Sequence, residues 1–197
     1  MMKFEISNQA HLPTKFGDFW VKSFREFIPN QDTPLEHLVV YSKELGQTPL
    51  VRIHSECLTG DVFGSKKCDC GNELALAMQQ IAQNKPDGGM LVYLRQEGRG
   101  IGLFNKINAY HLQDQGFDTV EANEKLGFPS DMRNYDIIKE IFKHFDITQI
   151  NLLTNNPKKI SALSPYAKVV RHSIITPTNP HNENYLTIKK QKMGHLL

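Results

Sequence analysis

Three cysteines carry the clearest chemical signal in this sequence. Cys57, Cys68 and Cys70 fall within one short segment, and the last two belong to a Cys-Asp-Cys-Gly sequence in which Gly71 permits a tight turn. Three soft sulfur ligands favour zinc, and a water molecule in the fourth position would make the site catalytic. Two alternatives stay open: free thiols that pack in the interior, or a structural site that His54 completes.

A glycine-rich segment forms a second candidate site. It reads Arg95-Gln96-Glu97-Gly98-Arg99-Gly100-Ile101-Gly102 and lies between a predicted strand and a predicted helix. Its glycines would expose backbone N–H groups and its arginines add positive charge, so it is a candidate phosphate cradle. It matches neither the dinucleotide-binding fingerprint nor the P-loop, so an ordinary tight turn is the alternative. Glu97 is a candidate ligand for magnesium on phosphate oxygens.

Two further polar segments border predicted elements. Residues 154–159, Thr-Asn-Asn-Pro-Lys-Lys, follow a strand at the edge where α/β sheets bind ligands, and a solvated loop is the alternative. Asp131 and Arg133 precede a predicted helix. From their position alone we interpret them as capping and decorating its start.

The elements that must position these residues are indicated by hydrophobic periodicity. Strands are predicted at 16–24, 38–42 and 50–54, where we expect antiparallel pairing, and at 90–94 and 150–153. Helices are predicted at 73–83, from the glycine-rich segment to Gly116, at 135–145 and at 184–197. This alternation predicts a mixed α/β (α+β) fold: one domain over 1–197, with a mixed sheet, N-terminal antiparallel strands and flanking helices.

Composition limits the function classes. Lys plus Arg number 23 against 21 Asp plus Glu, so a formal charge of +2 provides no global field for nucleic acid. No apolar run is long enough to cross a bilayer and the start lacks the apolar stretch of a secretion signal, so we expect a cytoplasmic protein without a membrane partner. A zinc-stabilised nucleic-acid-binding module is the alternative from another class.

The order and spacing of the motifs resemble those of GTP cyclohydrolase II, the first enzyme of riboflavin synthesis. The resemblance covers about 51 to 197 and matches segments 51–61, 68–71, 95–103, 112–116, 118–123, 126–128, 152–159 and 192–195, together with Tyr110, Asp131 and Arg133. A chance match of so many motifs in the same order is implausible, whereas a match to any single motif could arise by chance.

The resemblance implies a complete site. It assigns Cys57, Cys68 and Cys70 to one catalytic Zn²⁺ and implies Mg²⁺ with the triphosphate, GTP as the substrate and a homodimer. It assigns catalysis to Asp131, Arg133 and Tyr110, and GTP binding to Arg52, Ile53, His54, Ser55, Glu56, Glu73, Glu97, Gly98, Arg99, Thr119, Thr154 and Lys159.

The implied reaction converts GTP to 2,5-diamino-6-(5-phosphoribosylamino)pyrimidin-4(3H)-one, formate and pyrophosphate. Water on zinc would attack C8 of guanine, and the triphosphate would lose pyrophosphate. Tyr110 fits a hydroxyl donor to the opening ring, and Asp131 fits a base. The family scheme makes the residue at Arg133 a nucleophile, but a guanidinium is almost never deprotonated, so charge stabilisation is the alternative role.

Two features depart from the family pattern. Glu73 stands where a Gln is common, which puts that one nucleotide contact in doubt, and the loop from Asn84 to Gly89 is slightly long. The first fifty residues match less distinctly. The alternative closest in chemistry is a relative that opens the ring but retains the formyl group. The match at Tyr110 favours the complete reaction.

Overall fold

The computed structural model describes residues 3–196, and contacts between residues divide the chain into two compact units. The first unit comprises the described part of Met1–His54 with Ala75–Arg95 and Tyr135–Ile174. The second comprises Ser55–Leu74, Gln96–Asn134 and the described part of Ile175–Leu197. None of the helices in residues 3–196 combines the length and apolar character needed to span a bilayer.

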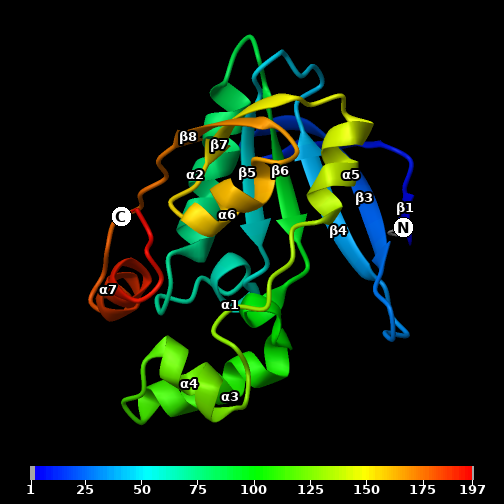
Figure 1. Cartoon of the computed structure of the whole chain (residues 1–197). Helices are drawn as coiled ribbons and strands as arrows, with labels where there is room; N and C mark the ends of the chain where they lie inside the picture. The colour runs from blue at the N-terminus through cyan, green and yellow to red at the C-terminus, as the bar shows by residue number, and fades with distance from the viewer. Residues whose placement is uncertain (1–2, 197) are drawn as a thin grey trace. The chain divides into compact units, whose positions relative to one another are not determined.

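Antiparallel strands form one part of the sheet in the first unit (Figure 1). They are β1 (Lys3–Ile6), β2 (Ala10–Thr14), β3 (Gly17–Phe27), β4 (Leu35–Tyr41) and β6 (Gly89–Leu94). β1 and β2 both pair with β3, which pairs with β4, and β4 pairs with β6. Phe19, Phe24 and Val39 of these strands are buried, as expected where one face of an antiparallel sheet covers a core.

Parallel strands form the other part of the same sheet. β5 (Leu50–Ser55) pairs in parallel with β7 (Gln149–Leu153), which pairs in parallel with β8 (Lys168–His172). The strand order is β1-β3-β4-β6-β5-β7-β8, with β2 beside β3. Every residue of β5 except Ser55 is buried, which is typical of a strand covered on both faces. The carboxyl ends of β5 and β7 therefore meet at one edge of the sheet.

Helices supply the other side of the core. α5 (Ile137–His144) buries Ile137, Ile138, Ile141 and Phe142, which share one helical face. These side chains pack in one cluster with buried residues of the strands, including Val92. α2 (Cys70–Gln83) contributes buried Ala77 and Ile81 to the first unit, and α6 (Pro157–Leu163) follows β7.

The second unit consists of short helices and loops. They are α1 (Leu58–Asp61), the 3-10 turn η1 (Glu97–Gly100), α3 (Gly102–Asp114), α4 (Thr119–Lys125) and α7 (Glu183–Gln191). α4 begins with a capping box, because the Asp118 carboxylate accepts from backbone N–H groups of the first turn while Glu121 accepts from the Asp118 N–H. Gly116 follows α3 with a positive φ of 100°, as a helix stop requires.

The mixed α/β prediction is confirmed, and five predicted strands correspond to β3, β4, β5, β6 and β7. The expected antiparallel pairing of the 50–54 segment is wrong with respect to β7, because the two strands run in parallel. Strands β1, β2 and β8 had no prediction; they are short and largely exposed, so their hydrophobic pattern is weak.

One predicted loop contains the start of a helix, and two predicted helices are shorter than expected. The 154–159 loop includes the start of α6, where the Asn156 side chain accepts from the Lys158 N–H and Pro157 occupies the first helical turn. α5 spans Ile137–His144 within the predicted 135–145. The C-terminal helix ends at Gln191, short of the predicted 197, and Leu197 itself lies outside the described residues.

Candidate functional site

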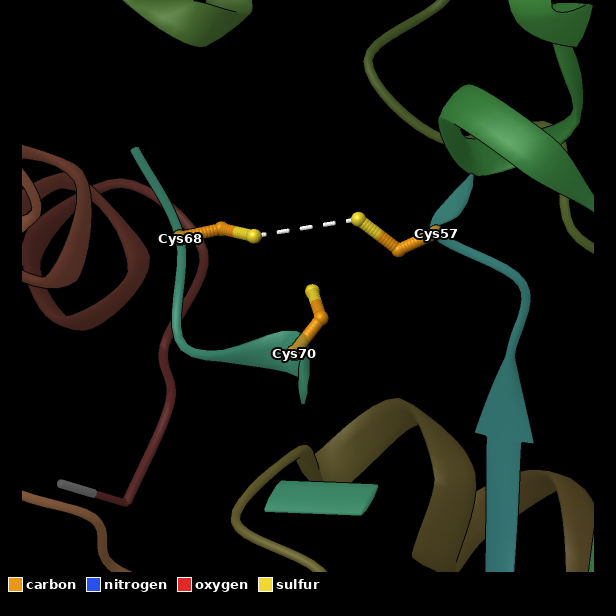
Figure 2. Close-up of side chains that lie close together, drawn as sticks. All are labelled: Cys57, Cys68 and Cys70. Atoms are coloured by element: carbon orange, nitrogen blue, oxygen red, sulfur yellow. Dashed lines mark hydrogen bonds between the residues drawn. The ribbon is translucent and has the colours of Figure 1, made fainter. Parts of the chain in front are cut away.

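The three sulfur atoms converge in the second unit (Figure 2). Cys57 follows β5, whereas Cys68 and Cys70 lie at the start of α2. The Sγ atoms of Cys57 and Cys68 are 3.7 Å apart, and all three Sγ atoms lie within 4.8 Å of one another. A tetrahedral zinc ion with bonds of about 2.3 Å spaces its sulfur ligands about 3.8 Å apart, so the cluster fits zinc.

Two glycines allow the sulfurs to approach. A Cβ on Gly71, in the first turn of α2, would lie 2.3 Å from the Gly60 carbonyl oxygen. A Cβ on Gly60, in α1, would lie 2.8 Å from Cys68 Sγ and 3.1 Å from Cys57 Sγ. The two helices can therefore place their cysteines together only because neither glycine carries a side chain. Gly71 serves this close approach and not the tight turn expected from the sequence.

A buried lysine neutralises one side of the cluster. The Lys106 ammonium on α3 donates to Cys57 Sγ at 3.1 Å and to Glu97 Oε1 at 2.7 Å. The other Glu97 oxygen accepts from the Leu58 N–H at 2.6 Å, which fixes the start of α1 beside Cys57. Burial opposes the charge of Lys106, but its hydrogen bond to Glu97 and the charges of Tyr110 and Cys57 raise its pKa above the ordinary value.

The thiols differ in acidity. Hydrogen bonds from the Cys68 and Cys70 thiols, assisted by the nearby Lys106 ammonium, hold the pKa of Cys57 well below its usual range. The hydrogen bond to Cys57 and burial raise the pKa of Cys68 to about 11. Hydrogen bonds with Cys57 and Cys68, together with burial, raise the pKa of Cys70. The Lys106 ammonium lies beside Cys57 and favours the thiolate of this sulfur, which is the form that binds metals.

Tyr110 lies next to the three cysteines, in contact with Thr59. Its hydroxyl is 3.2 Å from Thr59 Oγ1, and Thr59 Oγ1 is 3.8 Å from Cys57 Sγ. Burial raises the pKa of Tyr110, although the hydrogen bond with Thr59 and the charge of Lys106 partly oppose the shift. The phenol thus keeps its proton at neutral pH and can donate it to a ligand.

The glycine-rich segment adopts an unusual backbone. Gly98 and Arg99 both have left-handed dihedrals, with φ of 62° and 63°. The Arg99 conformation is strained for a residue with a side chain. Its side chain donates to the Ser130 carbonyl at 3.4 Å, and its carbonyl accepts from the Met132 N–H at 3.0 Å. The predicted phosphate cradle is therefore tied to the segment that contains Asp131 and Arg133.

Asp131 and Arg133 form a two-point ion pair. Arg133 Nε and Nη2 each donate to one Asp131 carboxylate oxygen at 2.8 Å, and both side chains are largely buried. The capping interpretation is wrong, because α5 begins with Asp136 as its N-cap and Asp131 accepts from the Arg133 backbone N–H instead. Two parallel charge-assisted hydrogen bonds stabilise the guanidinium as a cation.

A second group of predicted residues lies in the first unit, at the carboxyl ends of β5 and β7. Arg52 donates to the Leu153 carbonyl at 3.1 Å, and Lys159 of α6 donates to the Ile53 carbonyl at 2.7 Å. Thr154 is buried and its hydroxyl accepts from the Asn156 N–H at 3.1 Å. The structure therefore buries two cations at the sheet edge that the sequence had indicated for ligand binding.

The remaining predicted residues have separate surroundings. Ile53 belongs to the core cluster, and His54 stacks on Tyr93 with ring centroids 5.4 Å apart and is not part of the cysteine group. The Ser55 hydroxyl is buried and has no hydrogen-bond partner among residues 3–196. Glu56 is half-buried and Glu73, on α2, is buried. Thr119 begins α4 and lines a cavity of about 210 Å³ together with Tyr185 of α7.

Sequence reasoning missed Lys106 and Thr59. Lys106 precedes Tyr110 by four residues on α3, so the two share a helical face, and the Lys106 ammonium lies 5.6 Å from the Tyr110 ring centroid. That spacing is a signal that could have led from the predicted Tyr110 to Lys106. Thr59 has no comparable signal, because its role depends on how α1 and α3 pack.

Comparisons with known proteins match the whole chain. The model of the family described as GTP cyclohydrolase II matches residues 5–173. A GTP cyclohydrolase-2 from Helicobacter hepaticus is 76% identical over 196 residues, covering 100% of both chains. One from Helicobacter pylori is 56% identical over 197 residues, again covering 100% of both. One from Campylobacter hominis is 52% identical, covering 100% of this chain and 97% of its own.

The contact between Gly60 and Gly71 predicts a steric requirement for metal binding. In Gly71→Ala the new methyl group would meet the Gly60 carbonyl, so α1 must move away from α2 and separate Cys57 from the other sulfurs. We expect Gly71→Ala to lose about 1–3 kcal/mol of unfolding free energy and to bind less than one zinc per chain. Denaturant unfolding and metal analysis measure both, and Asn72→Ala, at an exposed position of the same helical turn, should behave like the wild type.

Proposed function

The chain belongs to the GTP cyclohydrolase II family, and from this membership we propose that it hydrolyses GTP to the diaminopyrimidine ribosyl phosphate, formate and pyrophosphate. It is accordingly an enzyme of riboflavin biosynthesis. The observation that carries the proposal is the convergence of Cys57, Cys68 and Cys70, beside a buried Lys106 and a protonated Tyr110.

The cysteines are proposed to hold one Zn²⁺. The sulfur spacing and the ammonium beside Cys57 support this assignment, because three thiolates leave zinc with excess negative charge that Lys106 offsets. Zinc supplies a Lewis acid and an activated water, which is the chemistry that the hydrolysis of a guanine carbon requires. Around it, Glu97 and Lys106 hold Cys57 and α1 in place, and Tyr110 presents its hydroxyl to the ring that opens.

Arg133 is proposed to stabilise negative charge on the triphosphate, and Asp131 is proposed to orient its guanidinium. The two-point ion pair keeps the guanidinium protonated and fixes its orientation, which favours charge stabilisation over attack by a neutral arginine nitrogen. Asp131 can still act as a base toward water, since the carboxylate is the basic partner of the pair.

The remaining GTP-binding residues keep the roles that the resemblance implies. Arg52, Thr154 and Lys159 are proposed to bind GTP, and the hydrogen bonds that their side chains now make would give way to contacts with ligand oxygens. Gly98 and Arg99 are proposed to bind phosphate, which the strained backbone supports. Mg²⁺ is proposed to neutralise the triphosphate during pyrophosphate release.

A homodimer is proposed from the family and supported by an apolar surface on α3. Leu103, Phe104 and Ile107 are 41%, 79% and 48% exposed and share one face of the helix. Exposed apolar side chains gathered on one face mark an interaction site. The extent of the catalytic domain over 1–197 and a cytoplasmic location stay predictions.

The proposed reaction is tested by its products. Purified protein incubated with GTP and Mg²⁺ should release formate and pyrophosphate in equal amounts, lose both activities after zinc chelation, and recover them when zinc is returned. Pyrophosphate without formate would indicate a relative that retains the formyl group. Neither product from zinc-loaded protein would contradict the enzymatic proposal and favour the nucleic-acid-binding alternative.

The proposed proton donor is tested by removing one hydroxyl. Tyr110→Phe should lower the rate of formate release by about 100-fold or more, the range for a positioned acid, with little change in the KM for GTP. The control is Tyr166→Phe, because the Tyr166 hydroxyl contacts Asp136 in the first unit. Unchanged formate release in Tyr110→Phe would remove Tyr110 from the mechanism.

The proposed dimer surface is tested by introducing charge. Phe104→Glu should shift the protein toward the monomer in analytical ultracentrifugation, because burying a charged side chain in an apolar interface is unfavourable. Ile175→Glu is the control, since Ile175 is 64% exposed but lies outside α3. If both variants sediment like the wild type, this face of α3 is not the interface.

A further inference from the structure

The C-terminal helix α7 contacts the turn that carries two of the metal ligands. Lys189 of α7 donates to both carboxylate oxygens of Asp69, at 2.7 and 2.9 Å. Asp69 stands between Cys68 and Cys70 in the sequence, and in Figure 2 the ribbon of the C-terminal helix lies on the Cys68 side of the cluster. A helix 120 residues further along the chain thus contacts the residue between two of the cysteines.

The Lys189–Asp69 pair is buried, which makes each partner dependent on the other. Asp69 is 2% and Lys189 is 8% exposed. A buried charge without its partner is strongly unfavourable, so neither side chain can remain in place alone. Burial opposes the charge of Lys189, yet Tyr185, Glu73, Asp69 and Cys70 hold its pKa above the ordinary value. The ammonium also lies 4.8 Å from the Tyr185 ring centroid.

The ion pair holds the turn from Cys68 to Cys70 through the side chain of Asp69. Both Asp69 oxygens are engaged by the ammonium, and the Asp69 carbonyl accepts from the Glu73 N–H at 2.9 Å at the start of α2. The residue between the two ligands is therefore held through its side chain and its backbone. Groups that orient metal ligands in this way tune affinity without touching the metal.

A second contact anchors α7 independently of the metal turn. Lys192, just beyond α7, pairs with Asp118 and lies 3.6 Å from Glu121, the two residues of the capping box that starts α4. α7 therefore has a fixed position between α4 and the metal turn. That anchoring allows Lys189 to position Asp69.

We propose that Lys189 is a positioning residue for the metal site: acting through Asp69, it holds Cys68 and Cys70 in the geometry that binds zinc. The site then reaches full affinity only when α7 is docked. This inference rests on the proposed zinc binding by the three cysteines, but it does not depend on which reaction follows.

The test compares zinc affinities of full-length variants. Competition with a chelator of known affinity should show about 10–100-fold weaker zinc binding for Lys189→Met, the usual loss when a residue that orients a metal ligand is removed. Lys189→Arg, which keeps the charge, should recover most of the affinity. Lys190→Met should bind zinc like the wild type, because Lys190 is exposed on the same helix. Cobalt-substituted Lys189→Met should show altered thiolate-to-cobalt absorption bands.

A double-mutant cycle separates positioning from general stability. If Lys189 acts through Asp69, Asp69→Asn should weaken zinc binding as Lys189→Met does, and the double variant should lose little more than either single variant. Circular dichroism of the metal-free proteins identifies any variant that does not fold. If Lys189→Met does not fold, the zinc affinities of Lys189→Arg and Asp69→Asn are compared with that of the wild type instead.

Two results would overturn the proposal. Zinc affinity within about twofold of the wild type in folded Lys189→Met and Asp69→Asn would show that the pair does not position the ligands, because oriented ligands lose at least tenfold. Losses that add in the double variant would show that Lys189 acts by another route. If the wild type itself binds no zinc, both the positioning role of Lys189 and the proposed zinc site fail. If the wild type binds zinc and the variants bind it equally well, only the positioning role fails.

Discussion

Concentrated negative charge around three sulfur atoms is the constraint on which the second unit depends. Thiolates can share one buried site only if a metal and nearby cations offset their repulsion, and Asp69 and Glu97 add two carboxylates beside them. The chain places one buried ammonium against each carboxylate, Lys106 from α3 and Lys189 from α7. The second unit thus contains two buried ion pairs beside the cysteines, whereas the described hydrophobic core cluster lies in the first unit.

Backbone approach and backbone strain have complementary roles at the site. Gly60 and Gly71 let two helices touch without side chains between them, which brings the sulfurs together. Gly98 and Arg99 hold left-handed dihedrals that a free chain would avoid at the arginine. Hydrogen bonds between Arg99 and the 130–132 segment, one donated by the Arg99 side chain and one by the Met132 N–H, help to maintain that conformation. The fold thereby supplies the stability that a strained turn lacks.

The cysteine group and the central strands could both be predicted from the sequence. Cys57, Cys68 and Cys70 could be recognised as candidate metal ligands because the chain has only three cysteines and they are closely spaced. The central strands could be predicted because their apolar periodicity is strong. The edge strands β1, β2 and β8 are exposed and give no such pattern, while the start of α6 was missed although Asn156 and Pro157 are regular helix-start residues.

The burial of lysines against carboxylates was not predicted from the sequence. Lys189 looks like an ordinary lysine on a polar helix, and only the folded chain shows that it is buried against Asp69. The spacing between Lys106 and Tyr110 points to a shared helical face, but not to the burial of Lys106 against Glu97. The capping interpretation of Asp131 and Arg133 failed for a related reason. A short-range pattern cannot distinguish a helix cap from an ion pair between the same residues.

The long separation between Asp69 and Lys189 also orders events on the ribosome. At 5–20 residues per second, the 120 residues between them take about 6–24 s to synthesise. Throughout that interval the nascent chain already contains all three cysteines, but it still lacks the ammonium that pairs with Asp69 in the folded protein. The turn between Cys68 and Cys70 thus acquires its buried counter-charge only after the strands and helices of the first unit have been synthesised.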